Sequence, residues 1–368
     1  MKLKYLVLFI LFFCLCANGQ RHYQDTIPFK THLGLITIPI IFNGIEKQFL
    51  FDTGASHSIG FSWVGKELKS TRKTINVSSS GGRVSKLRYH KSGKIELGSV
   101  KINKHRILKT RDSEIFSCYN IDGVLGVDII SEFNWTIDFK EKYLIMYPKT
   151  FVPESTQLMH PMQLQHKRRP FLILKTEKGK SVRFLLDTGA TSSDINKKVL
   201  LDTSSENPLD YEIYSGSYDF NGKRKNSFLK VLKRPFTSEK VTINGVFDYG
   251  IQSSKIGNRL WKDNRLFLSE NKKMFLVKNP VLDEFRSNYD CSFVFNDGAI
   301  IVGHVVVDSE AWEKGIRQGD EVKALNGKTF SNFCEITKYQ RGLVDVDDKI
   351  IVTLMDNSAI ELRRQQRF

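Results

Sequence analysis

Cysteine is scarce in this sequence. Of five cysteines in 368 residues, two lie in the apolar N-terminal stretch and the others are Cys118, Cys291 and Cys334. Three widely spaced cysteines exclude a disulfide framework. A single Cys291–Cys334 bridge and buried free thiols are both compatible with this pattern. No cysteine pair has zinc-site spacing and no histidines form an H-E-x-x-H pattern, so we expect no metal and no cofactor.

Motifs of other functional classes are also missing. The chain has no Gly-x-Ser-x-Gly elbow, which argues against serine hydrolysis. It is basic, with a formal net charge of +16, and lysines and arginines cluster at residues 167–169 and 223–225. No nucleic-acid-binding motif accompanies these clusters. We interpret them as solvated faces, with weak attraction to an acidic envelope surface as the second interpretation, and expect no nucleic-acid partner.

No apolar run is long enough for a comfortable membrane span. Two lysines precede an apolar core at residues 5–15, and Ala17-Asn18-Gly19 resembles a small-residue cleavage site. We interpret residues 1–19 as a signal peptide and expect an exported protein, periplasmic or extracellular, without a stable membrane span. An uncleaved anchor is the alternative. Large residues before both cysteines of this stretch argue against a lipid anchor.

The chain contains one phrase twice. Residues 49–56 read Phe-Leu-Phe-Asp-Thr-Gly-Ala-Ser, and residues 184–191 read Phe-Leu-Leu-Asp-Thr-Gly-Ala-Thr. Each copy is an apolar run, typical of a buried strand, that delivers an aspartate into a tight turn. Downstream, Leu125-Gly126 corresponds to Ile256-Gly257. These matches at nearly constant spacing indicate an internal duplication.

Short strands dominate the expected secondary structure. Asn43-Gly44 between two apolar runs is a strong hairpin signal. Residues 127–133 favour a short helix, and residues 309–327 combine a capping serine, a helix-ending glycine and an Asn-Gly turn. We expect the following organisation: an all-β lobe at 28–150, a linker at 151–169, a second lobe at 170–279 and a small α+β domain at 285–366.

The duplication suggests how the two aspartates could act. Two like lobes related by an approximate two-fold axis would bring Asp52 and Asp187 together. Two carboxylates in one site share a proton, so one can accept a proton from water while the other donates to a carbonyl oxygen. The following glycines, Gly54 and Gly189, allow close backbone approach. Phosphoryl transfer on an aspartate is excluded, because it needs a second aspartate where these glycines stand.

These motifs resemble the pepsin and retropepsin clan of aspartic proteases, most closely the tandem retropepsin-type exported proteases of bacteria with a C-terminal PDZ domain. The resemblance implies a mainly β fold, in which two retropepsin-like lobes form a bilobal pseudo-dimer and a small α+β PDZ domain follows. It implies that Asp52 and Asp187 are catalytic. Four residues would brace their loops: Thr53, Gly54, Thr188 and Gly189. Four others would lie in flaps over the substrate: Gly81, Gly82, Asn221 and Gly222.

Several positions depart from the family pattern. Lys255 replaces an apolar residue, which affects packing behind the second loop. Ser56 and Thr191 stand where retroviral relatives often place a substrate-contacting aspartate. Ala55 and Ala190 replace a hydroxyl that steadies the charged carboxylate in pepsin-like enzymes, so we expect a pH optimum nearer neutral than pepsin's.

The PDZ resemblance is most specific over residues 309–327. It implies a peptide groove formed by Tyr289, Asp290, Cys291, Ser292 and Phe293. Asp290 stands where glycine is usual and adds negative charge, which disfavours carboxylate capture and leaves strand addition. The expected partners are a peptide or protein substrate and a peptide or protein ligand at the PDZ domain. The alternative function is a catalytically silent, protease-like scaffold that binds peptides.

Overall fold

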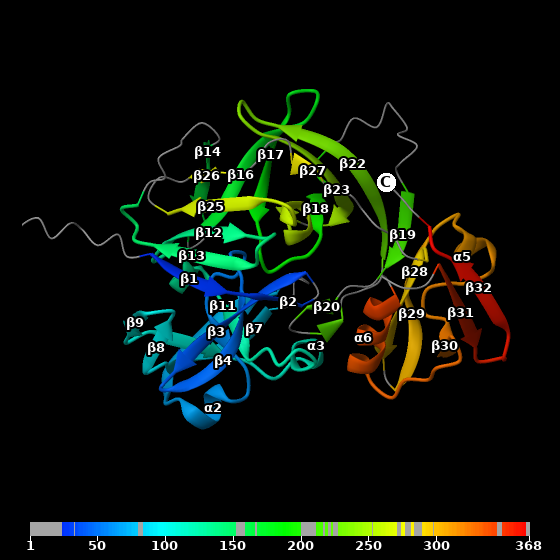
Figure 1. Cartoon of the computed structure of the whole chain (residues 1–368), viewed down its shortest axis with the longest axis horizontal. Coiled ribbons are helices and arrows are strands. Elements are labelled where there is room, and N and C mark those ends of the chain that lie inside the picture. The colour runs from blue at the N-terminus through cyan, green and yellow to red at the C-terminus, as the bar shows by residue number, and fades with distance from the viewer. Residues whose placement is uncertain are drawn as a thin grey trace, which may run out of the picture.

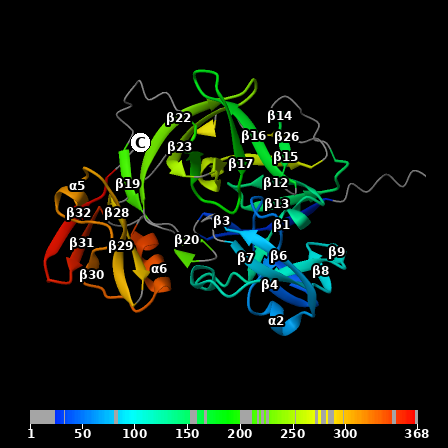
Figure 2. The ribbon, with the colours of Figure 1, turned by 180° about the vertical axis from the view of Figure 1, so that it is seen from behind.

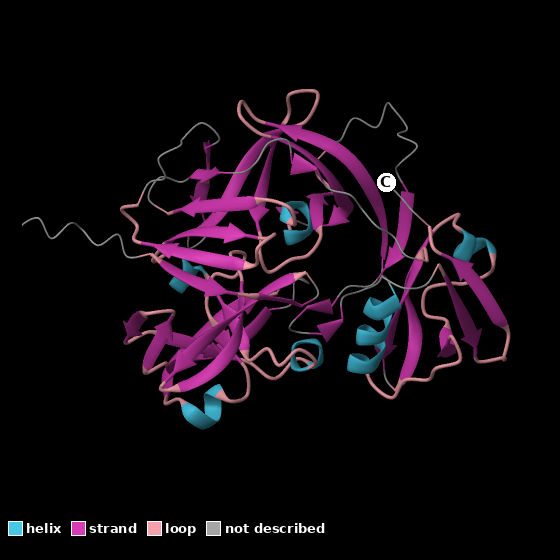
Figure 3. Cartoon of the chain, in the orientation of Figure 1, coloured by secondary structure: helices cyan, strands magenta, loops and turns pink. Residues whose placement is uncertain are grey.

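The chain is mainly β (Figure 3). A computed structural model describes these residues: 24–32, 34–79, 84–151, 159–165, 168–199, 211–215, 218–219, 222–223, 227–251, 253–270, 274–276, 281–282, 289–296, 298–343 and 348–365. The expected signal peptide lies outside them. No helix in the described ranges is long and apolar enough to cross a membrane.

A ten-stranded sheet forms most of the N-terminal part, residues 24–147. Its strands are β2 (Lys30–His32), β3 (Leu35–Phe42), β4 (Ile45–Phe51), β5 (Ile59–Gly60), β6 (Ser70–Ser78), β7 (Val84–Lys91), β8 (Lys94–Leu97), β9 (Val100–Asn103), β10 (Arg106–Lys109) and β11 (Gly123–Leu125). The helices of the N-terminal part are α2 (Val64–Glu67), α3 (Glu114–Ser117) and α4 (Val127–Ile130). The expected hairpin is confirmed between β3 and β4, with φ of +50° at Asn43 and +88° at Gly44, as a type I′ turn requires.

A fourteen-stranded sheet runs through the central part (residues 159–282) and the C-terminal part (residues 289–365). Its central strands are β15 (Gln163–Gln165), β16 (Arg169–Lys175), β17 (Ser181–Leu186), β18 (Ser193–Asn196), β19 (Tyr211–Ser215), β22 (Ser227–Thr237), β23 (Thr242–Ile251), β24 (Lys255–Ile256) and β27 (Val281–Leu282). Its C-terminal strands are β28 (Cys291–Asn296), β29 (Ala299–Val306), β30 (Glu321–Leu325), β31 (Lys349–Leu354) and β32 (Ala359–Arg363). The 3₁₀ helix η1 (Asn258–Trp261) and the helices α5 (Glu310–Glu313) and α6 (Phe333–Leu343) complete these parts.

The N-terminal and central parts repeat one pattern of strand pairing. In the first, β4 runs parallel to β11, which pairs antiparallel with β5. In the second, β17 runs parallel to β24, which pairs antiparallel with β18. The pairs β5–β10 and β18–β23 are both parallel. The sequence duplication is therefore also a duplication of topology, and each copy carries its aspartate to the end of an inner strand.

A six-stranded sheet joins the two copies (Figures 1 and 2). Its strands, in spatial order, are β1 (Asp25–Pro28), β13 (Tyr143–Tyr147), β12 (Asn134–Asp138), β25 (Arg265–Ser269), β26 (Met274–Leu276) and β14 (Met159–Pro161). The copies meet where β12 pairs with β25, and buried Asp138 forms an ion pair with Arg265 across this junction. The segment expected as a linker, residues 151–169, thus contains the strands β14 and β15.

Buried apolar side chains form several clusters, and two of these are the largest. One cluster of buried side chains spans both copies and includes Phe51, Trp135, Phe184 and Trp261. Phe51, next to the first aspartate, meets the ring of Trp135 edge-on with centroids 5.0 Å apart, so the aspartate strand packs on the joining sheet. A separate cluster fills the C-terminal part.

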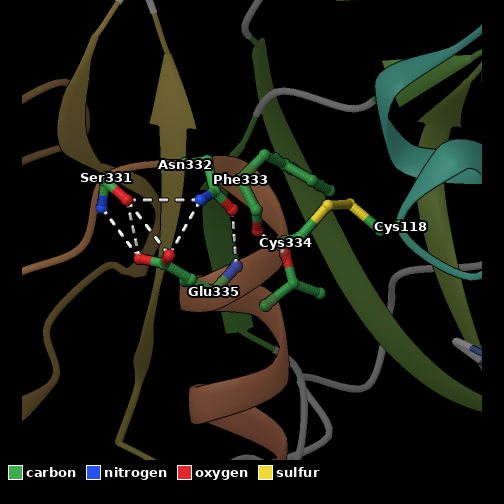
Figure 4. The surroundings of a disulfide bond; sticks show 7 residues. Cys118, Ser331, Asn332, Phe333, Cys334 and Glu335 are labelled. Atoms are coloured by element: carbon green, nitrogen blue, oxygen red, sulfur yellow. Dashed lines mark hydrogen bonds between the residues drawn. A yellow bond between two sulfur atoms is a disulfide. The ribbon is translucent and has the colours of Figure 1, made fainter.

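Local signals in the C-terminal part are largely confirmed. Ser309 Oγ accepts a hydrogen bond from Trp312 N–H at the start of α5, and Gly315, with φ of +88°, follows the helix. Helix α6 is capped at its start by Asn332. Asn332 Oδ1 accepts a hydrogen bond from Glu335 N–H at 3.0 Å, and the Glu335 carboxylate reaches back to Ser331 (Figure 4). The helix expected at 127–133 is shorter, since α4 ends at Ile130.

A disulfide links the N-terminal part to the C-terminal part. It joins Cys118, after α3, to Cys334 at the start of α6, across 216 residues of sequence (Figure 4). The alternatives of a Cys291–Cys334 bridge and of free thiols only are therefore wrong, because α3 packs on α6. Cys291 is a buried free thiol.

Removing this disulfide should destabilise the fold. We expect the Cys118→Ser/Cys334→Ser variant to lose about 2–4 kcal/mol of unfolding free energy, because the bond closes a long loop in the unfolded chain. Denaturant titration with and without reductant measures the effect. The control, Cys291→Ala, should keep the reductant sensitivity of the wild type. A wild-type midpoint that reductant leaves unchanged would show that the bond contributes nothing.

Candidate active site

The two aspartates occupy equivalent places at the ends of β4 and β17. Asp52 N–H donates to Leu125 O of β11 and Asp187 N–H donates to Ile256 O of β24, each at 3.0 Å. The neighbouring parallel strand thus holds the backbone of each aspartate where its own strand ends. The sequence landmarks Leu125 and Ile256 are the residues that do this in both copies.

Reciprocal hydrogen bonds between two threonines join the Asp-Thr-Gly turns. Thr53 N–H donates to Thr188 Oγ1 and Thr188 N–H donates to Thr53 Oγ1, each at 3.0 Å. Thr53 Oγ1 also donates to Leu186 O at 2.6 Å, and Thr188 Oγ1 donates to Phe51 O at 2.7 Å. Both threonines are 1% exposed. Separating the turns would leave these buried polar groups without partners, so the bonds hold the two aspartate strands together.

Each glycine of the turns lies directly against the opposite aspartate. A Cβ atom added to Gly54 would lie 2.4 Å from Asp187 Oδ1, and one added to Gly189 would lie 2.2 Å from Asp52 Cγ. Any side chain at these positions would displace a carboxylate. The glycines therefore permit the close approach that brings the two carboxyl groups into one site.

The backbone of each turn orients its carboxylate. Asp52 Oδ1 accepts hydrogen bonds from Gly54 N–H at 2.8 Å and Ala55 N–H at 2.9 Å, and Asp187 Oδ1 accepts one from Gly189 N–H at 3.0 Å. Burial raises the pKa of Asp52 well above its usual value, and the negative charge of Asp187 raises it further, against the two backbone hydrogen bonds. Asp52 therefore holds its proton to a higher pH than an ordinary aspartate does.

A second set of hydrogen bonds supports the backbone that packs against each Asp-Thr-Gly turn. Gly126 N–H donates to Ser58 Oγ and Gly257 N–H donates to Ser193 Oγ, each at 3.1 Å. In the first copy, Ser58 Oγ donates to Asp128 at 2.7 Å. The Asp128 carboxylate also lies 3.1 Å from His105 Nε2.

In the second copy, an ion pair is among these supporting contacts. Lys255 Nζ lies 3.2 Å from Asp194 Oδ2, and their side chains are 15% and 5% exposed. Lys255, which departs from the family pattern, is therefore neutralised by a buried carboxylate. Its charge does not disrupt packing behind the second turn.

In the basic cluster at residues 167–169, Arg168 is exposed, as a solvated face requires, whereas Arg169 is only partly exposed. Arg168 pairs with the buried carboxylate of Glu270. Arg169 is half-buried, and its Nη1 donates to Gly54 O at 3.4 Å, beside Asp52 and Asp187. No motif pointed to Arg169, because its position depends on how β16 of one copy crosses the turn of the other.

Of the four residues expected in the flaps, only Gly222 lies among the described residues. Gly81, Gly82 and Asn221 lie outside the described residues. Gly222 begins β21 (Gly222–Lys223), which pairs with β20 (Tyr218–Asp219) as a small antiparallel ladder.

The residues expected to form a peptide groove lie in β28 and directly before it. Tyr289, Asp290, Cys291 and Phe293 are buried, and Ser292 Oγ lies 2.5 Å from His304 Nδ1. Asp290 has φ of +58°, the left-handed conformation that glycine adopts most easily, at the position where glycine was expected.

Gln340 of α6 occupies the edge of β28. Phe293 N–H donates to Gln340 Oε1 at 2.8 Å, and Gln340 Nε2 donates to Phe293 O at 2.6 Å. These two backbone groups are the ones that an added strand would use. Sequence reasoning did not identify Gln340, because a glutamine within a helix carries no sequence signal of its contact.

The described residues contain no group of three or more histidine, cysteine, aspartate or glutamate side chains that could hold a metal ion.

Residues 38–129 match the family model of aspartyl proteases. This match includes the first Asp-Thr-Gly turn and the Leu125-Gly126 element, and it ends before the second turn. No curated protein matches the chain.

Opening the edge of β28 should strengthen peptide binding there. In Gln340→Ala, we expect extended peptides to bind about tenfold more tightly, because each competing hydrogen bond is worth about 1 kcal/mol net. Fluorescence anisotropy with a library of labelled peptides measures this. Lys338→Ala, an exposed change on the same helix, is the matched control. Equal affinity of Gln340→Ala and the wild type would show that Gln340 does not compete with peptides.

Proposed function

We propose that the chain is an aspartic endopeptidase that hydrolyses peptide bonds at Asp52 and Asp187. The observation that carries this proposal is the meeting of the two Asp-Thr-Gly turns through the reciprocal bonds of Thr53 and Thr188. A lone aspartate turn is compatible with a purely structural role, whereas a buried brace between two such turns supports a shared site for their carboxyl groups. The aspartyl protease match over residues 38–129 supports peptidase activity for the first copy.

The proposed reaction uses the single proton of the dyad. The ionised carboxylate accepts a proton from a water molecule as the water oxygen attacks the amide carbonyl carbon. The protonated carboxyl donates its proton to the carbonyl oxygen, which gives a neutral tetrahedral diol. As the diol collapses, the carboxyl that took the water proton donates it to the leaving nitrogen, the other carboxylate accepts a proton from a diol hydroxyl, and the C–N bond breaks, which leaves one proton on the dyad. The backbone hydrogen bonds to Asp52 and Asp187 keep the carboxyl groups oriented through these steps.

We propose the family architecture for the whole chain: retropepsin-like lobes at 28–150 and 170–279, joined through 151–169, and a PDZ domain at 285–366. The repeated strand pairing and the shared six-stranded sheet support a bilobal pseudo-dimer. The separate apolar cluster and the capped helix α5 support a distinct C-terminal domain that docks a peptide or a partner.

Export to the periplasm or the extracellular space is also part of the proposal. Residues 1–19 carry the sequence pattern of a signal peptide. The Cys118–Cys334 disulfide supports an oxidising compartment, because such bonds form and persist there.

Replacing either aspartate should abolish proteolysis. We expect Asp52→Asn and Asp187→Asn each to lower the rate of peptide hydrolysis by about 10²–10⁴-fold, since each removes one half of the acid/base couple. Cleavage of a denatured protein substrate, with a pepstatin-like transition-state mimic as inhibitor, measures this. Asp263→Asn, an exposed aspartate outside the site, is the matched control.

Two outcomes would contradict the mechanism. Full activity in either single variant would show that the carboxylates do not act as a pair. Absence of cleavage by the wild type, together with peptide binding in the cleft, would favour the catalytically silent scaffold.

The pH profile should peak nearer neutral pH than that of pepsin. The pKa of Asp52 is raised by burial and by Asp187, so the dyad retains its proton as the pH rises and loses activity only above this raised pKa. Initial rates with one fluorogenic peptide, measured from pH 2 to pH 9, test this. A maximum below about pH 3, where even an unperturbed aspartate is mostly protonated, would contradict it.

A further inference from the structure

Arg169 places a positive charge at the edge of the aspartate site. It is the first residue of β16, and its Nη1 donates to Gly54 O at 3.4 Å. Gly54 in turn lies against the Asp187 carboxylate. The charges of Asp187 and Asp52 both favour the charged form of Arg169, while burial opposes it. The guanidinium therefore belongs to the electrostatic surroundings of the dyad.

The guanidinium retains hydrogen-bonding capacity. Arg169 Nε is buried and has no hydrogen-bond partner, and among the described residues Arg169 forms no ion pair. Its neighbour Arg168 pairs with Glu270, and Arg265 pairs with Asp138. Arginine stays charged in proteins, and a half-buried guanidinium without a carboxylate is a strong site for an incoming one.

The internal duplication shows that this cation is particular to one side of the cleft. Gly34 and Arg168 occupy equivalent positions, since both adopt left-handed backbone with φ of +72° and +71° just before β3 and β16. The next residues are Leu35 and Arg169. Leu35 is buried in an apolar cluster with Leu50 and Val124. The positive charge therefore lies on the Gly54 side and has no counterpart at the equivalent position.

Past Asp52, the loop beside Arg169 carries no carboxylate over residues 53–57. Ala55 and Ser56 follow Gly54, and Ser56 Oγ lies 3.0 Å from His57 Nδ1. Ser56 stands where retroviral relatives often carry an aspartate. An acidic side chain on this side of the site must therefore come from outside the loop.

We propose that Arg169 forms a subsite for a carboxylate of the substrate, so that the cleft selects peptides with glutamate or aspartate on the Gly54 side of the cleaved bond. This inference rests on the proposed function insofar as the cleft holds the substrate. A charge-assisted, bidentate hydrogen bond from the guanidinium fork would fix the substrate's register against the dyad. The equivalent position, Leu35, offers only apolar contact, so the selection is one-sided.

Paired peptides test the subsite. In a set of octapeptides, glutamate or glutamine is placed at one position at a time, and kcat/KM is measured for each pair. The wild type should prefer glutamate about tenfold at one position on one side of the cleaved bond. Arg169→Gln should remove this preference mainly by raising KM for the glutamate peptide, while the glutamine peptide is little changed. Arg169→Lys should keep part of it.

Arg183→Gln is the matched control. Arg183 lies over the same Phe171 ring as Arg169, with its guanidinium carbon 5.2 Å from the ring centroid, but it is exposed and donates to Gln165. This variant should keep the glutamate preference.

Two results would overturn the subsite. One is a wild type that does not distinguish glutamate from glutamine at any position. The other is an Arg169→Gln variant that slows both peptides equally and shifts the pH profile, which would mean that Arg169 acts only on the charge of the dyad.

A binding measurement separates this inference from the proposed function. Affinities of the same peptide pairs are measured by fluorescence anisotropy for Asp52→Asn and for Asp52→Asn/Arg169→Gln, neither of which needs to cleave. A glutamate preference that is lost with Arg169 would support the subsite even if the wild type cleaves nothing. Cleavage without any glutamate preference in either assay would leave the protease proposal intact and overturn the subsite.

Discussion

The reciprocal hydrogen bonds of Thr53 and Thr188 are the constraint on which the rest of the site depends. Each threonine is almost fully buried and satisfies a backbone group of the opposite turn. This brace sets the distance at which Gly54 and Gly189 face the opposite aspartates, and hence the proximity of the two carboxyl groups. The raised pKa of Asp52 is the electrostatic result of that proximity and of burial.

Around this symmetric centre, the two copies differ in their supporting charges. The first copy backs its turn with Ser58 and Asp128, and the second neutralises Lys255 with Asp194. Both solutions satisfy buried polar groups, so both preserve the turn. The greatest difference is at Leu35 and Arg169, because there one copy presents an apolar side chain and the other a cation. A duplicated fold can thus keep a symmetric pair of aspartates while the side chains around the pair differ.

The C-terminal part is tied to the rest of the chain in two ways. Strand β19 of the central part pairs with β29, so that one sheet continues into the C-terminal strands. The disulfide from Cys118 to Cys334 fastens the start of α6 to the N-terminal part. Helix α6 also carries Gln340, which occupies the edge of β28. Helix α6 is therefore anchored covalently at its start, and farther along it covers the edge of strand β28.

Sequence alone determined the features that short-range patterns encode. The Asn43-Gly44 hairpin, the cap at Ser309 and the two aspartate strands follow from turn conformation, capping and apolar runs, and the duplication itself predicted that Asp52 and Asp187 would meet. Tertiary structure alone decided the Cys118–Cys334 pairing, the burial of Arg169 beside the dyad, the Lys255–Asp194 ion pair and the contact of Gln340. Each of these joins side chains whose approach depends on how strands and helices pack. No local periodicity or motif spacing records that packing.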